Sequence, residues 1–282
     1  MNLALASADV AGPEVLGYGE ISSVLALRSG ADGAAGKRLP PFPSEEAFEA
    51  YRVCFEAQLE AFEAGGIPVL ATGLRRVERP GAGPVAYCIQ PLVEAEALAP
   101  HRLARDSERR GRELFESVLQ LALGYVSPTR GFDAQLANWA VPGGSLVYLD
   151  VSTPFLRDEK GHERLDVDVF LASLPWALRG FVRRSMLRGI LDAYYSPRGV
   201  VLDLLGNLIK EGLGGRLPEL VPVAAQRLGE PVSVEEVRRH YARDARTWQL
   251  LQRLRRLDRA WQRHLRRRPY PFLLPGPVRR HV

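Results

Sequence analysis

The amino-acid sequence predicts an α+β protein, with a small antiparallel sheet in its N-terminal third and mainly helices after it. Residues 15–28 alternate in polarity and carry β-branched residues on both sides of a glycine turn, which predicts a β-hairpin. Beyond residue 98, apolar residues instead recur at helical spacing. The chain has 282 residues, 46% hydrophobic and 25% charged, so its composition is that of a folded globular protein rather than a disordered one.

The other N-terminal elements follow from their flanking residues. Glycine-rich residues 30–36 turn the chain into a short strand expected at Lys37–Leu39. A helix is expected over residues 45–64, because Ser44 can cap its start and Gly65-Gly66 can end it. Two more strands are expected at residues 67–74 and 84–93.

The remaining elements are mainly helical, and we expect an N-terminal lobe of residues 1–93 and a C-terminal lobe of residues 94–282. A helix is predicted over residues 98–126, interrupted near Asp106 and Ser107. After it we expect a short strand pair at 138–151, apolar helical segments at 169–191 and 200–213, and an arginine-rich helix near 233–268.

Charge, cysteine content and hydropathy narrow the class of protein. Residues 232–282 hold 14 arginines and 4 acids, so the basic character belongs to the C-terminal end. The sequence shows neither a secretory signal nor a run of about 18 uncharged apolar residues, and we expect a cytoplasmic protein. Cys54 and Cys88 are too far apart for a zinc knuckle and lie in apolar segments, which predicts reduced, packed thiols.

The segment GFDAQLANW, residues 131–139, carries the most specific pattern in the chain. Asp133 is followed five residues later by Asn138, and Asp150 ends a short apolar run. Carboxylate and amide oxygens in this spacing can surround one metal–phosphate group. Taken singly, Asp133 and Asn138 also fit a turn with Asx hydrogen bonding, and Asp150 fits a strand-end cap.

Two upstream motifs suit phosphate binding. Residues 17–24 read GxGxxSxV, and glycines in such a turn let backbone N–H groups approach a phosphate, although an ordinary hairpin turn also fits. Lys37, in an A-x-K pattern, can neutralise phosphate oxygens, or it can be a solvated surface lysine. In the following helix, Glu56 is favoured over Glu60 as the partner of Lys37, because apolar residues flank it.

In this order, over residues 14–155, the motifs resemble the protein-kinase-like superfamily, specifically its divergent bacterial branch near the aminoglycoside phosphotransferases and other small-molecule kinases. The resemblance implies a two-lobed protein-kinase-like fold, with a small antiparallel-sheet N-lobe and a mainly helical C-lobe, that uses ATP and Mg²⁺. It implies that Asp133 is the catalytic base and that Asn138 and Asp150 bind the metal. The nucleotide contacts that it implies are Gly17, Tyr18, Gly19, Ser22, Val24, Lys37, Glu56, Gln90, Leu92 and Glu94, the last three around an adenine-binding hinge.

Departures from the kinase pattern limit the activity that the resemblance implies. Gly131-Phe132 precedes Asp133 where kinases show H-R-D or H-G-D, so we expect Phe132 to fill the space of the missing histidine. Ser152 replaces the glycine of D-x-G, and no A-P-E segment follows, which disfavours a protein substrate. The function implied is ATP- and Mg²⁺-dependent phosphotransfer to a small-molecule hydroxyl. The alternatives are a nucleotide-binding pseudokinase with a basic interaction helix and an enzyme that transfers AMP.

The C-terminal helix has an apolar stripe and a basic remainder. We expect the stripe to dock this helix on the C-terminal lobe and leave a solvated basic face. The alternative is an anionic partner: a phosphorylated or carboxylated acceptor, an anionic membrane surface or nucleic acid, the last disfavoured because no base-stacking pattern occurs. The acceptor molecule has no signature in residues 155–282. The stripe consists of Trp248, Leu251, Leu254, Leu257, Trp261 and Leu265.

Overall fold

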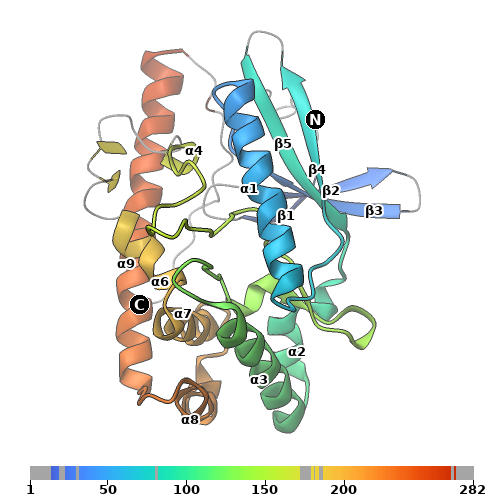
Figure 1. Ribbon diagram of the computed structural model, residues 1–282, viewed down its shortest axis with the longest axis vertical. Helices are drawn as coiled ribbons and strands as arrows, with labels where there is room; N and C mark the ends of the chain where they lie inside the picture. The colour runs from blue at the N-terminus through green and yellow to red at the C-terminus, as the bar shows by residue number, and fades with distance from the viewer. Residues whose placement is uncertain are drawn as a thin grey trace.

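The computed structural model describes residues 14–18, 23–29, 32–79, 82–171, 179–180, 182–183, 187–267 and 270. A five-stranded antiparallel sheet with one long helix forms the N-terminal part, and helices dominate the rest (Figure 1). This is the expected α+β, two-lobed arrangement, with a small antiparallel-sheet lobe followed by a mainly helical lobe. The described ranges contain no helix with the length and apolar character needed to cross a bilayer.

The sheet has the strand order β1-β2-β3-β5-β4, and every pairing is antiparallel. Its strands are β1 (Val15–Tyr18), β2 (Ser23–Ser29), β3 (Asp32–Arg38), β4 (Gly73–Arg79) and β5 (Ala82–Pro91). The predicted hairpin is confirmed as β1 and β2. The connection from β3 to β4 carries α1 (Glu45–Ala64), which lies beside β4 and β5 (Figure 1).

Two strand boundaries differ from the prediction. The strand expected at Lys37–Leu39 instead spans Asp32–Arg38, because Asp32 to Gly36 pair in register with β2. A Cβ at Gly36 would lie 2.6 Å from Cδ1 of Leu27, so the Leu27 side chain packs directly against the glycine backbone. The strand expected at 67–74 is wrong as well: β4 starts at Gly73 and is a charged edge strand, which apolar patterning cannot identify.

Helix α1 is confirmed with the predicted bounds. The Ser44 hydroxyl accepts a hydrogen bond from the backbone N–H of Ala47, and Gly66, at φ 71°, lies in the left-handed region just past the end. Its buried face packs into the main core with residues of β5 and of the helical lobe. That face consists of Phe48, Tyr51, Cys54, Phe55, Gln58 and Phe62.

The helical lobe is built around α3 and α7, whose apolar faces share the main core with the strand pair β6–β7. The predicted interruption at Asp106–Ser107 is confirmed, since Ser107 caps α3. The apolar segment at 169–191 lies partly outside the described residues. The elements are η1 (Ala95–Ala97), α2 (Ala99–Arg105), α3 (Glu108–Tyr125), η2 (Leu136–Asn138), β6 (Trp139–Ala140), η3 (Pro142–Gly144), β7 (Val147–Tyr148), α4 (Asp168–Leu171), α6 (Arg188–Tyr194), α7 (Pro197–Lys210), η5 (Gly214–Arg216) and α8 (Leu217–Leu228).

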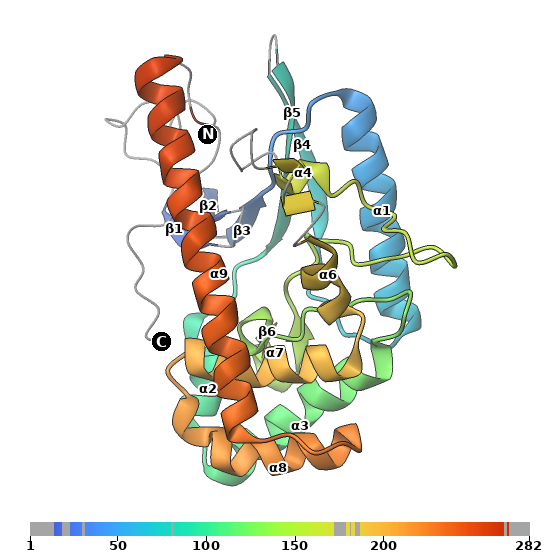
Figure 2. The ribbon, with the colours of Figure 1, turned by 90° about the vertical axis from the view of Figure 1, so that its left-hand side faces the viewer.

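The C-terminal helix α9 (Val234–Ala260) continues into a π-helical turn, η6 (Trp261–Leu265). Ser233 caps its start by accepting a hydrogen bond from the backbone N–H of Glu236. Val237, Tyr241 and Ala245 are buried on its first half, which packs against α7. From there α9 rises past the level of the sheet (Figure 2).

Candidate functional site

The two lobes are joined by an ion pair between Lys37 of β3 and Asp150, the second residue after β7. Nζ of Lys37 lies 2.7 Å from Oδ1 of Asp150, and the side chains are 19% and 24% exposed. The two residues are 113 positions apart in the chain. Two residues singled out separately in the sequence therefore meet in one half-buried contact.

The register of the sheet explains the direction of the Lys37 side chain. Lys37 pairs with Val24 on β2 and with Cys88 on β5, and residues directly opposite each other in antiparallel strands project from the same face. Cys88 belongs to the main core between the sheet and the helical lobe. Lys37 and Val24 thus lie on the face of the sheet turned toward Asp150, while Leu25, Val85 and Tyr87 form a separate cluster on the other face.

Asp150 is held in its charged form. Burial by itself would raise the pKa of this carboxyl, but the Lys37 ammonium and hydrogen bonds from Ser152 outweigh it, and the pKa lies below its ordinary value. The backbone N–H and the hydroxyl of Ser152 donate to Oδ1 at 3.2 and 2.9 Å. The serine that replaces glycine therefore fixes the orientation of the carboxylate.

Asp133 has the opposite electrostatic setting. Burial, followed by the nearby negative charges of Asp203 and Asp150, raises its pKa to about 8. Its Oδ1 accepts one hydrogen bond, from the backbone N–H of Gln135 at 3.2 Å. A carboxyl whose pKa lies near neutrality is suited to proton exchange.

Asn138 lies next to Asp133 and is oriented by it. The Asn138 Nδ2 donates to the backbone oxygen of Asp133 at 3.3 Å, and the Tyr148 hydroxyl donates to the same oxygen at 2.9 Å. The backbone N–H of Leu149 donates to the Asn138 carbonyl, which links the loop to the segment that carries Asp150. Asp133, Asn138 and Asp150 are therefore brought together as predicted, with Lys37 facing them from the sheet.

Phe132, the residue before Asp133, anchors this loop in the hydrophobic core. It is 1% exposed, and its ring lies 4.9 Å from that of Tyr148 and 5.3 Å from that of Tyr125, centroid to centroid. Trp139 and Phe62 complete the aromatic cluster. The expectation that Phe132 fills core space is confirmed, because its ring packs within this buried aromatic cluster.

Helix α7 contributes residues that the sequence analysis missed. Gln135 of the loop donates to Asp203 at 3.0 Å and accepts from Lys210 at 3.1 Å, while the buried Asn207 accepts from the backbone N–H of Ala137 at 3.2 Å. Asn207 also donates to the Gln135 side-chain oxygen at 3.3 Å. The available signal was the spacing of Asp203, Asn207 and Lys210, which puts three polar residues on one face of an otherwise apolar helix.

The predicted ion pair between Lys37 and Glu56 is wrong. Glu56 is exposed and pairs with Arg52, one turn earlier on α1, at 2.6 Å. Glu60 is exposed as well. The interior face of α1 instead presents Tyr51, whose hydroxyl donates to the backbone oxygen of Ser152 at 2.9 Å. Apolar neighbours in the sequence did not predict which face of α1 carries Glu56. The buried face of α1 includes Cys54 and Phe55, and Glu56 lies on the exposed face.

Comparisons with known proteins supply a family. The model of the family described as "Family of unknown function (DUF6206)" matches residues 5–259. The chain belongs to this family. None of the curated proteins matches the DUF6206 chain significantly.

Two solved structures are similar in shape to this DUF6206 member. One is WaaP in complex with acyl carrier protein, at 14% sequence identity and TM-score 0.36, covering 80% of this chain and 89% of that chain. The other is the MAP kinase LmaMPK10 from Leishmania major, at 14% identity and TM-score 0.34, covering 81% and 82%.

The expected adenine hinge of the DUF6206 chain comprises Gln90, Leu92 and Glu94. The Gln90 side chain links the sheet to the helical lobe. Gln90 donates through Nε2 to the Thr72 hydroxyl and to the backbone oxygen of Leu149, both at 2.8 Å. The backbone N–H of Leu92 donates to Gly33 at 3.2 Å, and the Glu94 carbonyl accepts from Ala97 at 3.0 Å. These backbone groups are used within the protein, and the Leu92 and Glu94 side chains are exposed.

The glycine-rich turn is described only in part. Gly17 pairs with Val24 across β1 and β2. Among the described residues, no atom lies within 4 Å of a Cβ built on Gly17. Tyr18 ends β1. Gly19 and Ser22, with the Tyr18 side chain, lie outside the described residues.

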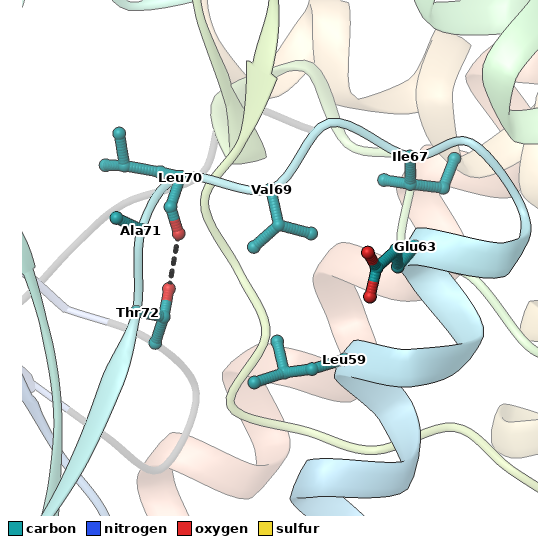
Figure 3. A pocket seen from close by; sticks show the side chains of 7 residues that line it. All are labelled: Leu59, Glu63, Ile67, Val69, Leu70, Ala71 and Thr72. Carbon is teal, nitrogen blue, oxygen red and sulfur yellow. Dashed lines mark hydrogen bonds between the residues drawn. The ribbon is translucent and has the colours of Figure 1, made fainter.

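A separate pocket of about 290 Å³ lies between the end of α1 and the segment before β4. Figure 3 shows Leu59 and Glu63 on α1 facing Val69, with Leu70 and Thr72 on the far wall. The Thr72 hydroxyl donates to the Leu70 carbonyl at 2.6 Å. Since Thr72 also accepts from Gln90, this pocket adjoins the contact between the lobes without including Lys37 or Asp133.

The donor chemistry near Asp150 fits a hard cation that is shared with a ligand. Asn138 and Asp150 offer one amide oxygen and one carboxylate, and Mg²⁺ is commonly held by one or two protein oxygen ligands together with substrate phosphates. Within the described ranges, no group of three or more His, Cys, Asp and Glu side chains forms a dedicated metal cage.

Proposed function

We propose that this protein is an ATP- and Mg²⁺-dependent phosphotransferase whose acceptor is a small-molecule hydroxyl. The observation that carries the proposal is the 2.7 Å contact between Lys37 and Asp150, beside Asp133 and Asn138. The main obstacles to phosphoryl transfer are charge on the phosphates and alignment of the acceptor. A lysine, two oxygen donors and a carboxyl near neutral pKa address both.

In this proposal Lys37 exchanges its partner when nucleotide binds. In the structure the Lys37 ammonium pairs with Asp150; in the nucleotide complex it would contact phosphate oxygens instead. Ser152 keeps the Asp150 carboxylate oriented. Asn138 and Asp150 hold Mg²⁺, which when bound neutralises negative charge on the phosphates. Gly17 and Val24 lie on the sheet side of the nucleotide, with Gln90 and the segment through Leu92 and Glu94 at its adenine end.

Asp133 is the proposed general base. Its carboxyl orients the acceptor hydroxyl and takes its proton as the oxygen bonds to phosphorus. The anionic form is favoured above the pKa of about 8, and cationic groups in the complete complex would lower that value. Gln135, held by Asp203 and Lys210, positions the loop on the acceptor side.

A nucleotide-binding pseudokinase is the second candidate. It is favoured by the absence of an α1 carboxylate at Lys37, since both Glu56 and Glu60 are exposed. In that case Tyr51 fixes α1 to Ser152 permanently, and Lys37 and Asp150 serve binding alone. This protein would then bind nucleotide without consuming it.

Calorimetry with Mg-ATP, followed by phosphate transfer to a panel of hydroxylated metabolites, tests the proposal. We expect binding by the wild type, transfer to at least one acceptor, loss of turnover in Asp133→Asn with nucleotide binding retained, and loss of Mg-dependent binding in Asp150→Ala. Glu56→Gln is the matched control and should behave as the wild type. The exposed Glu56 carboxylate pairs with Arg52 on the same helix and not with Lys37. Binding without transfer to any acceptor supports the second candidate, and the absence of binding contradicts both.

A further inference from the structure

The second half of α9, together with η6, exposes an apolar stripe where the sequence predicted a docked one. Leu257 and Leu265 are each 66% exposed, and Trp261 is 49% exposed. Leu250 is half exposed and continues the same side of the helix at spacings of seven, four and four residues. Together Leu250, Leu257, Trp261 and Leu265 are called the outer stripe, and at 1.5 Å per residue it is about 22 Å long.

The opposite side of the same segment faces the protein. Leu251 packs with the small cluster of Leu171 and Val182, and Gln252 and Asp258 are buried. The predicted docking stripe is therefore half-buried at Trp248, Leu251 and Leu254. The prediction is wrong for its second half, Leu257, Trp261 and Leu265. Polar and apolar residues share the docked side, while the side chains of the outer stripe are from 49% to 66% exposed.

The charge around the outer stripe has a single sign. Residues 246–267 contain eight arginines and one acidic residue, Asp258, which is buried. The exposed charged residues of this segment are therefore basic. They include Arg246, Arg253, Arg263, Arg266 and Arg267.

We propose that the outer stripe and its arginines bind the surface of an anionic lipid bilayer, with the helix lying in the plane of the interface. A helix with leucine and tryptophan on one side, flanked by the exposed Arg246 and Arg253 at spacings of three and four residues, suits that location, since acyl chains cover the stripe and anionic headgroups meet the guanidinium groups. Nucleic acid would pair the arginines and leave the leucines in water. An acidic protein would need a groove matched to this convex helix, whereas a bilayer accepts it directly.

The inference is independent of the proposed phosphotransferase activity. Its test is sedimentation of the full chain with vesicles of phosphatidylcholine alone and with vesicles that also contain phosphatidylglycerol. We expect binding to the anionic vesicles that weakens with added salt, and at least about tenfold weaker binding to the neutral ones.

Variants separate the two contributions. Leu257→Ala with Leu265→Ala, and independently Arg246→Gln with Arg253→Gln, should each weaken binding to anionic vesicles about tenfold or more. The matched controls are Val53→Ala with Ile190→Ala, which removes exposed apolar groups elsewhere, and Arg109→Gln on α3. These controls should bind as the wild type does, and circular dichroism of every variant checks folding.

Tryptophan emission gives a second readout. Emission should shift to the blue when anionic vesicles are added, and Trp261→Phe should bind but lose that shift. The proposal is overturned if anionic vesicles do not bind the protein, or if the leucine variants bind them as well as the wild type. It is also overturned if the leucine variants change the oligomeric state in sedimentation velocity, or if soluble DNA or polyglutamate binds with the same dependence on the leucines.

Discussion

The hydroxyl of Tyr51 donates a 2.9 Å hydrogen bond to the backbone oxygen of Ser152, and both residues are buried. This contact fastens α1 to the segment that carries Asp150. An ion pair between the strand lysine and the helix was expected to make that connection. The protein thus uses a neutral, buried hydrogen bond to set the position of α1 relative to the candidate site.

Tyr51→Phe should destabilise the protein by about 1–2 kcal/mol, because the Ser152 carbonyl loses its donor in a buried setting. It should also weaken nucleotide binding, since Ser152 orients Asp150. Urea unfolding and calorimetry measure the two effects. Glu56→Gln is the control, and an equal loss of stability in it would contradict the role assigned to Tyr51.

Lys37→Met should leave the Asp150 carboxylate without its closest cation and lower the free energy of unfolding at pH 7 by about 1 kcal/mol. In the wild type, the lowered pKa of Asp150 contributes stability above the unfolded-state pKa, and that contribution is lost as pH falls through the folded-state value. The difference between variant and wild type should therefore shrink below about pH 4. A difference that stays constant down to pH 2 would show that charge is not its cause.

Asp133→Asn should stabilise the protein while removing its proposed activity. The folded state holds the Asp133 proton up to a pKa of about 8, so wild-type stability falls as pH rises from about 4 to about 8. The variant lacks this titration, and its advantage should grow across that window to at least about 1 kcal/mol. Denaturant melts at pH 5 and pH 8 measure the advantage; the same value at both would contradict the assignment.

Asn207→Ala should lower the free energy of unfolding by about 1–3 kcal/mol. The Ala137 N–H and the Gln135 side-chain oxygen would each lose the hydrogen bond that they make with the buried Asn207. Its effect on turnover should exceed its effect on nucleotide binding, since both groups belong to the loop of Asp133. Lys210→Gln serves as a milder comparison, because Lys210 is exposed. A variant that loses nucleotide binding and turnover in equal measure would argue against a loop-positioning role.

The α1 helix and the Asp133 loop show what could be predicted locally. Ser44 and Gly66 set the ends of α1 through caps that depend on neighbouring residues alone, and its bounds were predicted correctly. In contrast, β4 was misplaced, because a charged edge strand is defined by pairing with β5 and not by its own pattern. The same distinction separates Phe132, predicted to be core, from Asp203, whose role depends on a helix folding back over the loop.

The sequence by itself determined which chemical groups this protein has and their order: a glycine turn, Lys37, Asp133, Asn138 and Asp150, on elements whose type follows from periodicity and capping. The tertiary structure alone decided which of these groups contact each other and which face solvent. It paired Lys37 with Asp150, turned Glu56 to solvent, put Tyr51 in contact with Ser152 and left Leu257 and Trp261 uncovered. The reason is physical: a helix can rotate by one residue at little local cost, and long-range packing selects the side that is buried.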